Sequence, residues 1–197
     1  MKHIFIINAG QNFGHSSGQF NKTITNATEA FFSKMPSTMV KTTHIANGYN
    51  AKEEVKKYVW ADIIIYHTPI WWFQVPHNFK KYIDVVFTEG HNNGIYSSDG
   101  RRSTNPNINY GTGGLMHNKK YMVTSSWNAP RTAFTMPGEF FNETSVDDGP
   151  LFGFHKMNAF TGMNPIKSFH FHDVEKNADI NRDMVIYSQH LQQQFKD

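Results

Sequence analysis

Hydroxyl, amide and glycine residues are concentrated in the loop that follows the first apolar run of the chain. Residues 4–7 form this run, and Asn8-Ala9-Gly10 and His15-Ser16-Ser17-Gly18-Gln19 follow it before an amphipathic segment begins. Backbone N–H groups and the positive end of a helix dipole suit a phosphate at such a place. Neither G-x-G-x-x-G nor G-x-x-x-x-G-K-[ST] occurs here, so hydroxyl, amide and backbone groups would hold the phosphate, as in flavin sites. The alternative is an ordinary capped helix after an edge strand.

Three consecutive aromatic residues lie in a second loop. Trp71-Trp72-Phe73 stand within Thr68–Pro76, directly after a continuous apolar run. Neighbouring side chains diverge, so these three cannot all point into one core. A planar heteroaromatic ring stacked on them would use them well. The alternative is a hydrophobic plug or a dimer contact, but the phosphate-type loop favours ring binding.

A third polar and aromatic loop reads Ser125-Ser126-Trp127-Asn128-Ala129-Pro130. Its side chains and free backbone N–H groups suit the pyrimidine side of a flavin. Donors at that side would stabilise the negative charge of the reduced ring and raise its potential. Three such loops at one edge of a sheet indicate a ligand crevice more strongly than any one of them.

The scaffold that would bring these loops together is predicted by the alternation of strand-like and helix-like segments. The expected strands are Lys2–Asn8, Thr38–Ile45, Asp62–His67, Lys120–Ser125 and Ile166–Phe171, the last after a turn at Asn164-Pro165. The expected helices are Gln19–Lys34, Lys52–Trp60, His77–Phe87 and Arg182–Phe195. We therefore expect an α/β fold, flavodoxin-like, with a five-stranded parallel sheet and helices on both faces, in a single domain over residues 1–197.

Two segments are too long to be simple connectors. Thr88–Asn118 is rich in glycine and has little periodicity, and Trp127–Gly153 is similar. Loops of this length in a compact domain are usually functional, often as lids or dimer surfaces.

Composition excludes several classes of protein. Apolar residues make up 39% of the chain and charged residues 18%, which is typical of a globular protein. The formal charge is only +3 and the basic residues are scattered in pairs, so we expect no nucleic-acid partner. Cysteine is absent, which excludes disulfides and fits the cytoplasm. No stretch approaches the roughly 20 apolar residues of a membrane span, so we expect none.

Two further residue groups are candidate ligand sites. His170 and His172 would share one face of a strand end, but a solvated strand end is the simpler interpretation, and we expect no metal. Arg101 and Arg102 could grip the extra phosphate of NADPH, although two exposed loop arginines are slightly favoured.

Several short motifs occur in order along nearly the whole chain. They are His15-Ser16-Ser17-Gly18-Gln19, Pro69-Ile70-Trp71-Trp72, Lys80-Lys81-Tyr82-Ile83-Asp84, Phe87-Thr88-Glu89-Gly90-His91, Ser98-Asp99-Gly100-Arg101, Tyr110-Gly111-Thr112-Gly113-Gly114 and Ser126-Trp127-Asn128-Ala129-Pro130. In these motifs the chain resembles the modulator of drug activity B family of bacterial NADPH:quinone oxidoreductases, within the flavodoxin-like quinone reductases.

The resemblance implies FAD as cofactor, with FMN less favoured, and a homodimer whose flavin site lies near the subunit interface. The residues implied to hold the pyrophosphate are Ser16, Ser17, Gly18, Gln19, Phe20, Asn21, Lys22 and Thr23. Those implied to hold the isoalloxazine ring are Pro69, Ile70, Trp71, Trp72, Ser126, Trp127, Asn128 and Ala129, and Tyr110 would also contact the cofactor. Ile70 stands where the family commonly has glycine, which would change how closely the backbone approaches the ring.

The implied reaction passes a hydride from NADPH through flavin N5 to a quinone. Tyr110 is the catalytic candidate, because a phenol can hydrogen-bond or protonate the quinone oxygen; the alternative is that it anchors its loop. A flavodoxin-type electron carrier is disfavoured because such carriers are usually strongly acidic. A flavin-binding regulator without turnover stays open.

Overall fold

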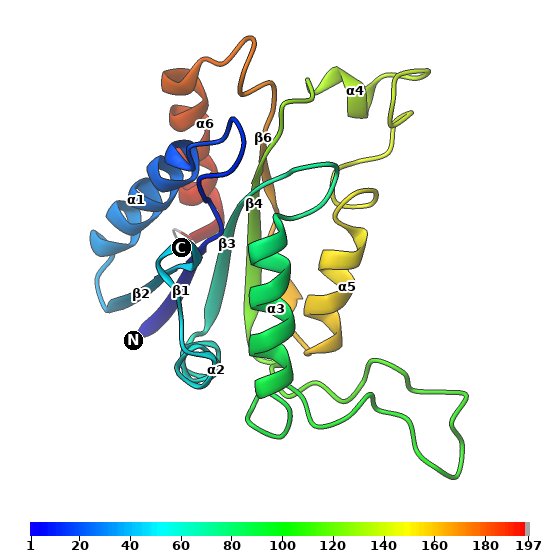
Figure 1. The fold of residues 1–197 in the computed structure, drawn as a ribbon. Coiled ribbons are helices and arrows are strands. Elements are labelled where there is room, and N and C mark those ends of the chain that lie inside the picture. The colour runs from blue at the N-terminus through cyan, green and yellow to red at the C-terminus, as the bar shows by residue number, and fades with distance from the viewer. Residues whose placement is uncertain (196–197) are drawn as a thin grey trace.

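The computed structural model describes residues 1–195 and contains a parallel sheet with the strand order β2-β1-β3-β4-β5 (Figure 1). The strands are β1 (Lys2–Asn8), β2 (Thr38–His44), β3 (Ile63–Pro69), β4 (Lys120–Ser126), β5 (Asn164–Pro165) and β6 (Phe169–Phe171). Every pairing is parallel, so the carboxyl ends of the strands meet at one edge, the upper edge in Figure 1. The predicted flavodoxin-like sheet is confirmed.

The edge of the sheet next to β4 differs from the prediction of a single fifth strand. Instead of one strand over Ile166–Phe171, two short segments pair with β4, and β5 covers the residues that were expected to form a turn. The Ile166 N–H donates to the Tyr121 carbonyl (2.6 Å), after which the chain leaves the ladder until Phe169. Pro165 has no N–H to donate, which is tolerated only on an edge strand. The sheet edge is therefore interrupted at residues 166–168.

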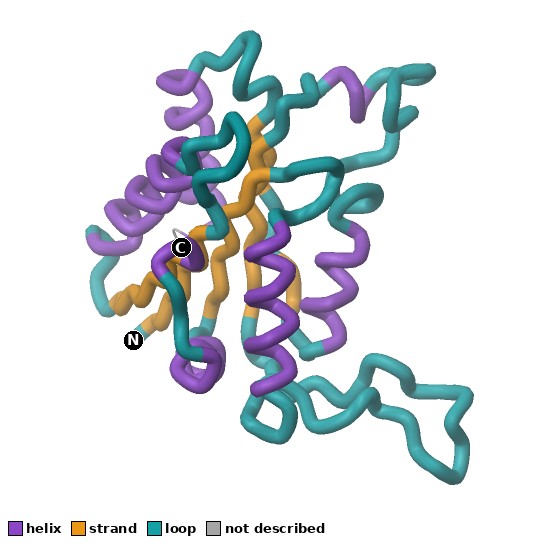
Figure 2. Tube along the Cα trace, viewed as in Figure 1, coloured by secondary structure: helices purple, strands orange, loops and turns teal. Residues whose placement is uncertain are grey.

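Helices cover both faces of the sheet, as predicted (Figure 2). They are α1 (Gln19–Ser33), η1 (Ile45–Asn47, a 3₁₀ turn), α2 (Ala51–Trp60), α3 (His77–Glu89), α4 (Thr132–Thr135), α5 (Phe152–Phe160) and α6 (Ile180–Phe195). Helices α1 and α6 pack on one face, and α2, α3 and α5 on the other. The sequence did not predict α4, α5 or η1. In α5, only Phe154 and Asn158 are buried, so its apolar periodicity is weak.

Two apolar layers result from the alternation of side chains along the strands. Ile4 and Ile6 of β1 face α1 and α6, whereas Phe5 and Ile7 face the other helices. All seven residues of β3 are buried, as expected for a central strand covered on both faces. This rigid frame holds the loops that follow β1, β3 and β4.

The glycine-rich segment between α3 and β4 projects from the opposite end of the sheet as a long loop (Figure 2). Its contacts with the rest of the chain include the bond from the Met116 N–H to the Thr161 carbonyl (2.9 Å). Over residues 1–195, no helix is both long and apolar enough to cross a membrane.

Candidate functional site

The three loops expected to bind a ligand lie together at the carboxyl edge of the sheet. The ring of Phe13 in the first loop stacks on Trp71 in the second, with centroids 5.1 Å apart. The Ile70 N–H donates to the Ser126 carbonyl (3.0 Å), which joins the second loop to the third. Ser126 Oγ lies 3.5 Å from Asn21 Oδ1 at the start of α1, so the third loop also reaches the first helix.

The start of α1 is an open donor site. Gly18, at the N-cap position, is in the left-handed conformation (φ 72°) and has no side chain that could cap the helix. Asn21 is 3% exposed, and its Nδ2 has no hydrogen-bond partner among the described residues. An orphaned buried amide costs about 1–3 kcal/mol, so this arrangement suits a bound acceptor such as a phosphate.

Because Gly10 has no side chain, the first loop can lie directly against the start of α1. A Cβ built on Gly10 would lie 2.6 Å from Asn21 Cβ and 2.9 Å from Asn8 Oδ1, closer than real contacts allow. Asn8 Oδ1 already accepts the Gly10 N–H at 2.8 Å. Any larger residue at position 10 would therefore push the first loop away from α1.

The other residues that the resemblance implies for pyrophosphate binding differ in whether their polar groups are free or engaged within the chain. Ser16 forms a two-residue hairpin with Phe13, and Ser17 Oγ accepts the Gln19 N–H at 3.4 Å. Thr23 Oγ1 is 3.1 Å from the Gln19 carbonyl, and Lys22 is exposed. Phe20 packs its ring on Phe171 (5.0 Å) and so contributes to the core rather than to a polar site.

The second loop is a tight hairpin turn with bulky residues at its centre. The Trp71 and Gln74 backbones exchange hydrogen bonds of 2.9 and 3.0 Å. Between them, Trp72 (φ 49°) and Phe73 (φ 65°) are both left-handed, which is the geometry of a type I′ turn. Such turns strongly prefer Asn-Gly, because a side chain strains this conformation. Trp72 is 92% exposed, so no internal packing accounts for the strain.

The third loop offers backbone donors rather than a stacking ring. The Trp127 side chain is only 3% exposed and packs on Phe134 (5.1 Å), so it cannot stack on a ligand. Its own N–H donates to the Phe171 carbonyl (2.9 Å). The N–H groups of Asn128 and Ala129 make no backbone hydrogen bond within residues 1–195, and they are the donors this loop presents.

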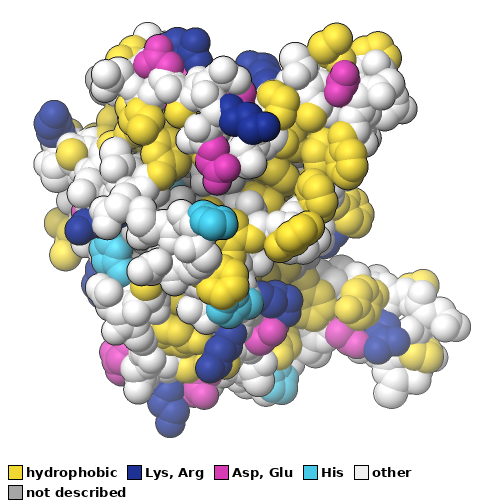
Figure 3. All heavy atoms as spheres, turned by 45° about the horizontal axis from the view of Figure 1, so that its top comes forward, with side chains coloured by type: hydrophobic (Ala, Val, Ile, Leu, Met, Phe, Trp, Pro, Cys, Tyr) yellow, Lys and Arg dark blue, Asp and Glu magenta, His cyan; other side chains and the backbone are white. Residues whose placement is uncertain are grey.

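An aromatic wall that the sequence analysis missed closes one side of the edge. Phe140, from the segment after α4, stacks on Phe73 with centroids 5.4 Å apart, and Phe141 stacks on Phe134 at 4.1 Å. Phe140 is 73% exposed. Viewed toward this edge, hydrophobic side chains gather around a hollow (Figure 3). The Phe140-Phe141 doublet was the available signal, but nothing in the sequence shows that its loop folds back toward residue 73.

Tyr110 does not lie with these residues within one chain. It belongs to the segment between α3 and β4, which projects from the opposite end of the sheet (Figure 2); it is 71% exposed, and its ring centroid is 5.8 Å from that of Phe160, the last residue of α5. Arg101 lies over the Tyr110 ring (5.6 Å), and its Nε and Nη2 both donate to Asp99 Oδ2 (2.8 and 2.6 Å). The structure therefore groups Tyr110 and Arg101 with each other and not with the three loops.

A buried histidine lies beneath the loops. His67 on β3 is in register with Asn8 of β1 and Thr124 of β4, and it is fully buried. Burial lowers the pKa of His67 to about 3, so its ring is neutral near pH 7. Neither ring nitrogen has a hydrogen-bond partner among the described residues. The residue beneath the three loops is therefore polar but uncharged near pH 7.

Within residues 1–195, no cluster of three or more side chains is arranged to hold a metal ion. His170 is engaged with Ser125 Oγ (2.7 Å) and with Asp147. Burial lowers the pKa of His172 to about 4, with a smaller effect from His170.

A parallel sheet of this order, with a hydroxyl-rich loop after its first strand and an aromatic turn after its third, defines the flavodoxin-like class of α/β proteins. A family model described as the flavodoxin-like fold matches residues 2–195. The chain belongs to this family.

Individual proteins within this family are similar to the chain over nearly its whole length. The chain is 43% identical to an uncharacterized protein of Schizosaccharomyces pombe, covering 98% of this chain and 96% of that one. It is 39% identical to the NADPH:quinone oxidoreductase MdaB of Haemophilus influenzae, covering 98% of this chain and 99% of that one. This confirms the family resemblance read from the motifs. The structure of a putative quinone reductase from Klebsiella pneumoniae has a TM-score of 0.71, covers 100% of this chain and 85% of its own, and at 18% identity shows the fold alone.

Proposed function

We propose that the protein is an FAD-dependent NADPH:quinone oxidoreductase. The reaction consumes NADPH, a proton and a quinone, and yields NADP⁺ and the hydroquinone in one two-electron turnover. The observation that carries the proposal is the convergence of an open helix start, a strained aromatic turn and free N–H groups at one sheet edge. The identity of 39% with a named NADPH:quinone oxidoreductase supports it.

The pyrophosphate of FAD would be held at the start of α1. The unpaired Asn21 Nδ2, the hydroxyls of Ser16 and Ser17 and the first N–H groups of the helix supply donors there. The absence of a side chain at Gly10 lets the first loop pack directly against Asn21, which keeps these donors together. FMN would use the same phosphate site, so this geometry supports a flavin but does not distinguish FAD from FMN.

The isoalloxazine ring would lie between the aromatic turn and the third loop. Bound flavin supplies a ring that accepts a hydride from NADPH at N5 and passes it to a quinone. Trp72 would stack on a planar ring, while the N–H groups of Asn128 and Ala129 would stabilise negative charge on its pyrimidine side. Phe73 and Phe140 would exclude water from the face that the substrates share.

Tyr110 can serve this site only from a second copy of the chain. Because it lies at the far end of the sheet in its own chain, the proposal requires a homodimer in which Tyr110 of one subunit approaches the flavin of the other. Its phenol would then donate a hydrogen bond or a proton to the quinone oxygen. Cytoplasmic location, favoured by the absence of cysteine, remains part of the proposal.

The visible absorption spectrum of the purified protein tests the proposal directly. We expect a yellow protein that bleaches on addition of NADPH and regains colour when menadione is added, and acid extraction should release FAD. A yellow protein that does not bleach would instead be a carrier or a regulator. A colourless protein that takes up neither FAD nor FMN would overturn the proposal.

A further inference from the structure

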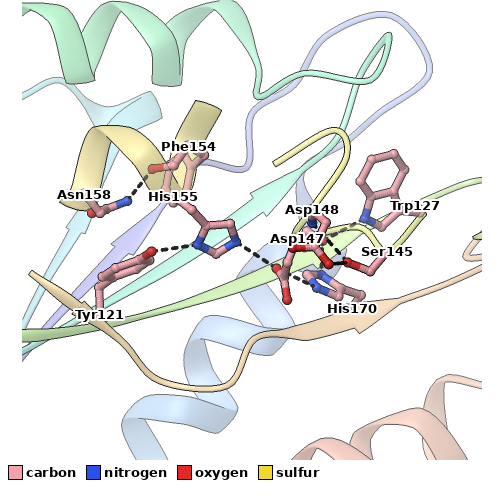
Figure 4. Close-up of polar contacts among 10 residues, drawn as sticks. Tyr121, Trp127, Ser145, Asp147, Asp148, Phe154, His155, Asn158 and His170 are labelled. Carbon is pink, nitrogen blue, oxygen red and sulfur yellow. Dashed lines mark hydrogen bonds and ion pairs between the residues drawn. The ribbon is translucent and has the colours of Figure 1, made fainter. Parts of the chain in front are cut away.

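Two hydrogen-bond chains end on one carboxylate beside the interrupted sheet edge (Figure 4). Asp147, from the segment between α4 and α5, accepts hydrogen bonds at the same oxygen, Oδ1, from His155 Nε2 (2.8 Å) and His170 Nε2 (3.2 Å). His155 lies on α5 and His170 on β6. The segment between α4 and α5, helix α5 and strand β6 are thus joined at one atom.

The direction of the His170 chain follows from which groups can only donate. The Trp127 indole is a donor only, so Ser125 Oγ accepts from Trp127 Nε1 at 2.7 Å. Ser125 is fully buried, and its O–H must find an acceptor, which is His170 Nδ1 at 2.7 Å. His170 then carries its proton on Nε2 and donates it to Asp147. The order of donation is Trp127 to Ser125 to His170 to Asp147.

The His155 chain repeats this pattern without reaching the candidate site. Burial raises the pKa of Tyr121, so its phenol keeps its proton and donates to His155 Nδ1 (2.7 Å). His155 donates in turn from Nε2 to Asp147. Burial alone would raise the pKa of Asp147, but the hydrogen bonds from His155 and His170 bring it well below its ordinary value. The carboxylate is therefore the fixed acceptor of both chains.

Trp127 connects one of these chains to the third loop of the candidate site. Its side chain points away from the ligand edge, and its backbone is tied on both sides: the N–H to Phe171 (2.9 Å) and the carbonyl to the Val174 N–H (3.1 Å). The indole hydrogen bond fixes the remaining freedom of the residue. Asn128 and Ala129 follow directly, so the orientation of Trp127 sets where their N–H groups point.

We propose that His170 and Asp147 are positioning residues for the loop Ser126–Ala129, acting through Ser125 and the Trp127 indole. The chain orients and does not conduct protons, because an indole N–H cannot accept one. The part of the proposal that concerns flavin affinity rests on the proposed function. The part that concerns Trp127 does not.

His155 provides a matched control. His170→Gln and His155→Gln each keep a donor toward Asp147 and remove the acceptor that Nδ1 provides, but only His170 is linked to Trp127. The first readout is the indole N–H resonance of Trp127 among those of the four tryptophans, recorded on flavin-free protein. We expect this resonance to shift and to exchange faster with solvent in His170→Gln, and to stay in place in His155→Gln.

The second readout is FAD affinity, measured by quenching of flavin fluorescence. We expect His170→Gln to weaken binding about 10-fold and His155→Gln less than 2-fold, as for residues that orient a ligand-binding group. Losses of affinity that only follow the stability of each variant would overturn the proposal, as would an unmoved Trp127 resonance in His170→Gln. If the unmodified protein binds no flavin, the proposed function fails, while the indole readout still decides the positioning role.

Asp147→Asn keeps the test decisive if His170→Gln does not fold. This variant removes the carboxylate charge, and a neutral amide oxygen accepts more weakly than a carboxylate, so both chains should loosen and the Trp127 resonance should shift. Asp148→Asn is the control, because Asp148 is bonded to Ser145 (2.7 Å) and lies outside both chains. Equal behaviour of the two variants would contradict the proposal.

Discussion

The strained turn Trp72-Phe73 offers the sharpest separation of ligand binding from folding. Replacing Trp72 by asparagine places a residue that tolerates the left-handed conformation at the first central position of the type I′ turn. A left-handed side chain costs about 1–2 kcal/mol. Trp72 is 92% exposed, so almost no apolar burial is lost when it is removed. We therefore expect Trp72→Asn to raise the free energy of unfolding of the flavin-free protein by about 1 kcal/mol.

At the second central position, strain and packing oppose each other. Phe73→Gly relieves about 1–2 kcal/mol of strain. It also loses the pairs that Phe73 makes with Phe140 (5.4 Å) and Phe141 (5.8 Å). Each such pair contributes about 0.5–1.5 kcal/mol beyond the apolar area that it buries, and Phe73 is only 44% exposed, so the lost packing should outweigh the relieved strain and make this variant less stable.

Urea unfolding followed by circular dichroism at 25 °C measures these changes, and a rise of 1 kcal/mol corresponds to a melting temperature higher by about 2–4 °C. FAD titration of the same samples should show weaker binding for Trp72→Asn. Ser37→Gly is the control: Ser37 is exposed and left-handed (φ 55°) but lies at the other end of the sheet, before β2, so it should gain stability without losing flavin affinity. If flavin-free Trp72→Asn is less stable than the unmodified protein, the strain is not held for a ligand and the reasoning is wrong.

Three further outcomes follow from the same geometry. His67 is neutral when folded (pKa about 3) but titrates near 6.5 when unfolded, so its contribution to stability should fall as the pH drops below 6.5, by about 2 kcal/mol at pH 5; in urea unfolding at pH 7.5 and pH 5 the unmodified protein should therefore lose about 2 kcal/mol more than His67→Leu, in which His172 (pKa about 4) still causes an acid loss of its own. Gly10→Ala should lower stability by about 1–3 kcal/mol and weaken FAD binding, because its Cβ would lie 2.6 Å from Asn21 Cβ; unchanged melting and unchanged affinity would mean that the loop yields freely. Tyr110→Phe should slow quinone reduction more than reduction of the flavin by NADPH in stopped-flow traces, whereas equal effects on both half-reactions would assign Tyr110 to loop anchoring alone.

The sequence predicted the sheet well because burial of strands leaves a strong local signal. The apolar run that became β3 and the alternating strand and helix segments needed only periodicity to be recognised. The fifth strand is predicted only in part: β6 lies within the expected range Ile166–Phe171, but Asn164-Pro165 forms an edge strand instead of the expected turn, because a missing N–H is tolerated at the edge of a sheet. Helix α5 was missed because only two of its residues are buried.

For the candidate site, the sequence by itself determined which loops are rich in donors and aromatic rings, since residue type and neighbouring strands are local properties. Only the tertiary structure decided how those side chains are used. The Trp127 side chain is buried in the core, and Trp72 is exposed on a strained turn. Tyr110 belongs to the segment that projects from the end of the sheet opposite the candidate site. The tertiary structure also brought Phe140 onto Phe73 and joined Asp147 to two histidines. Most of these contacts link residues distant in the chain, and no local pattern of residue types specifies where a long loop folds back.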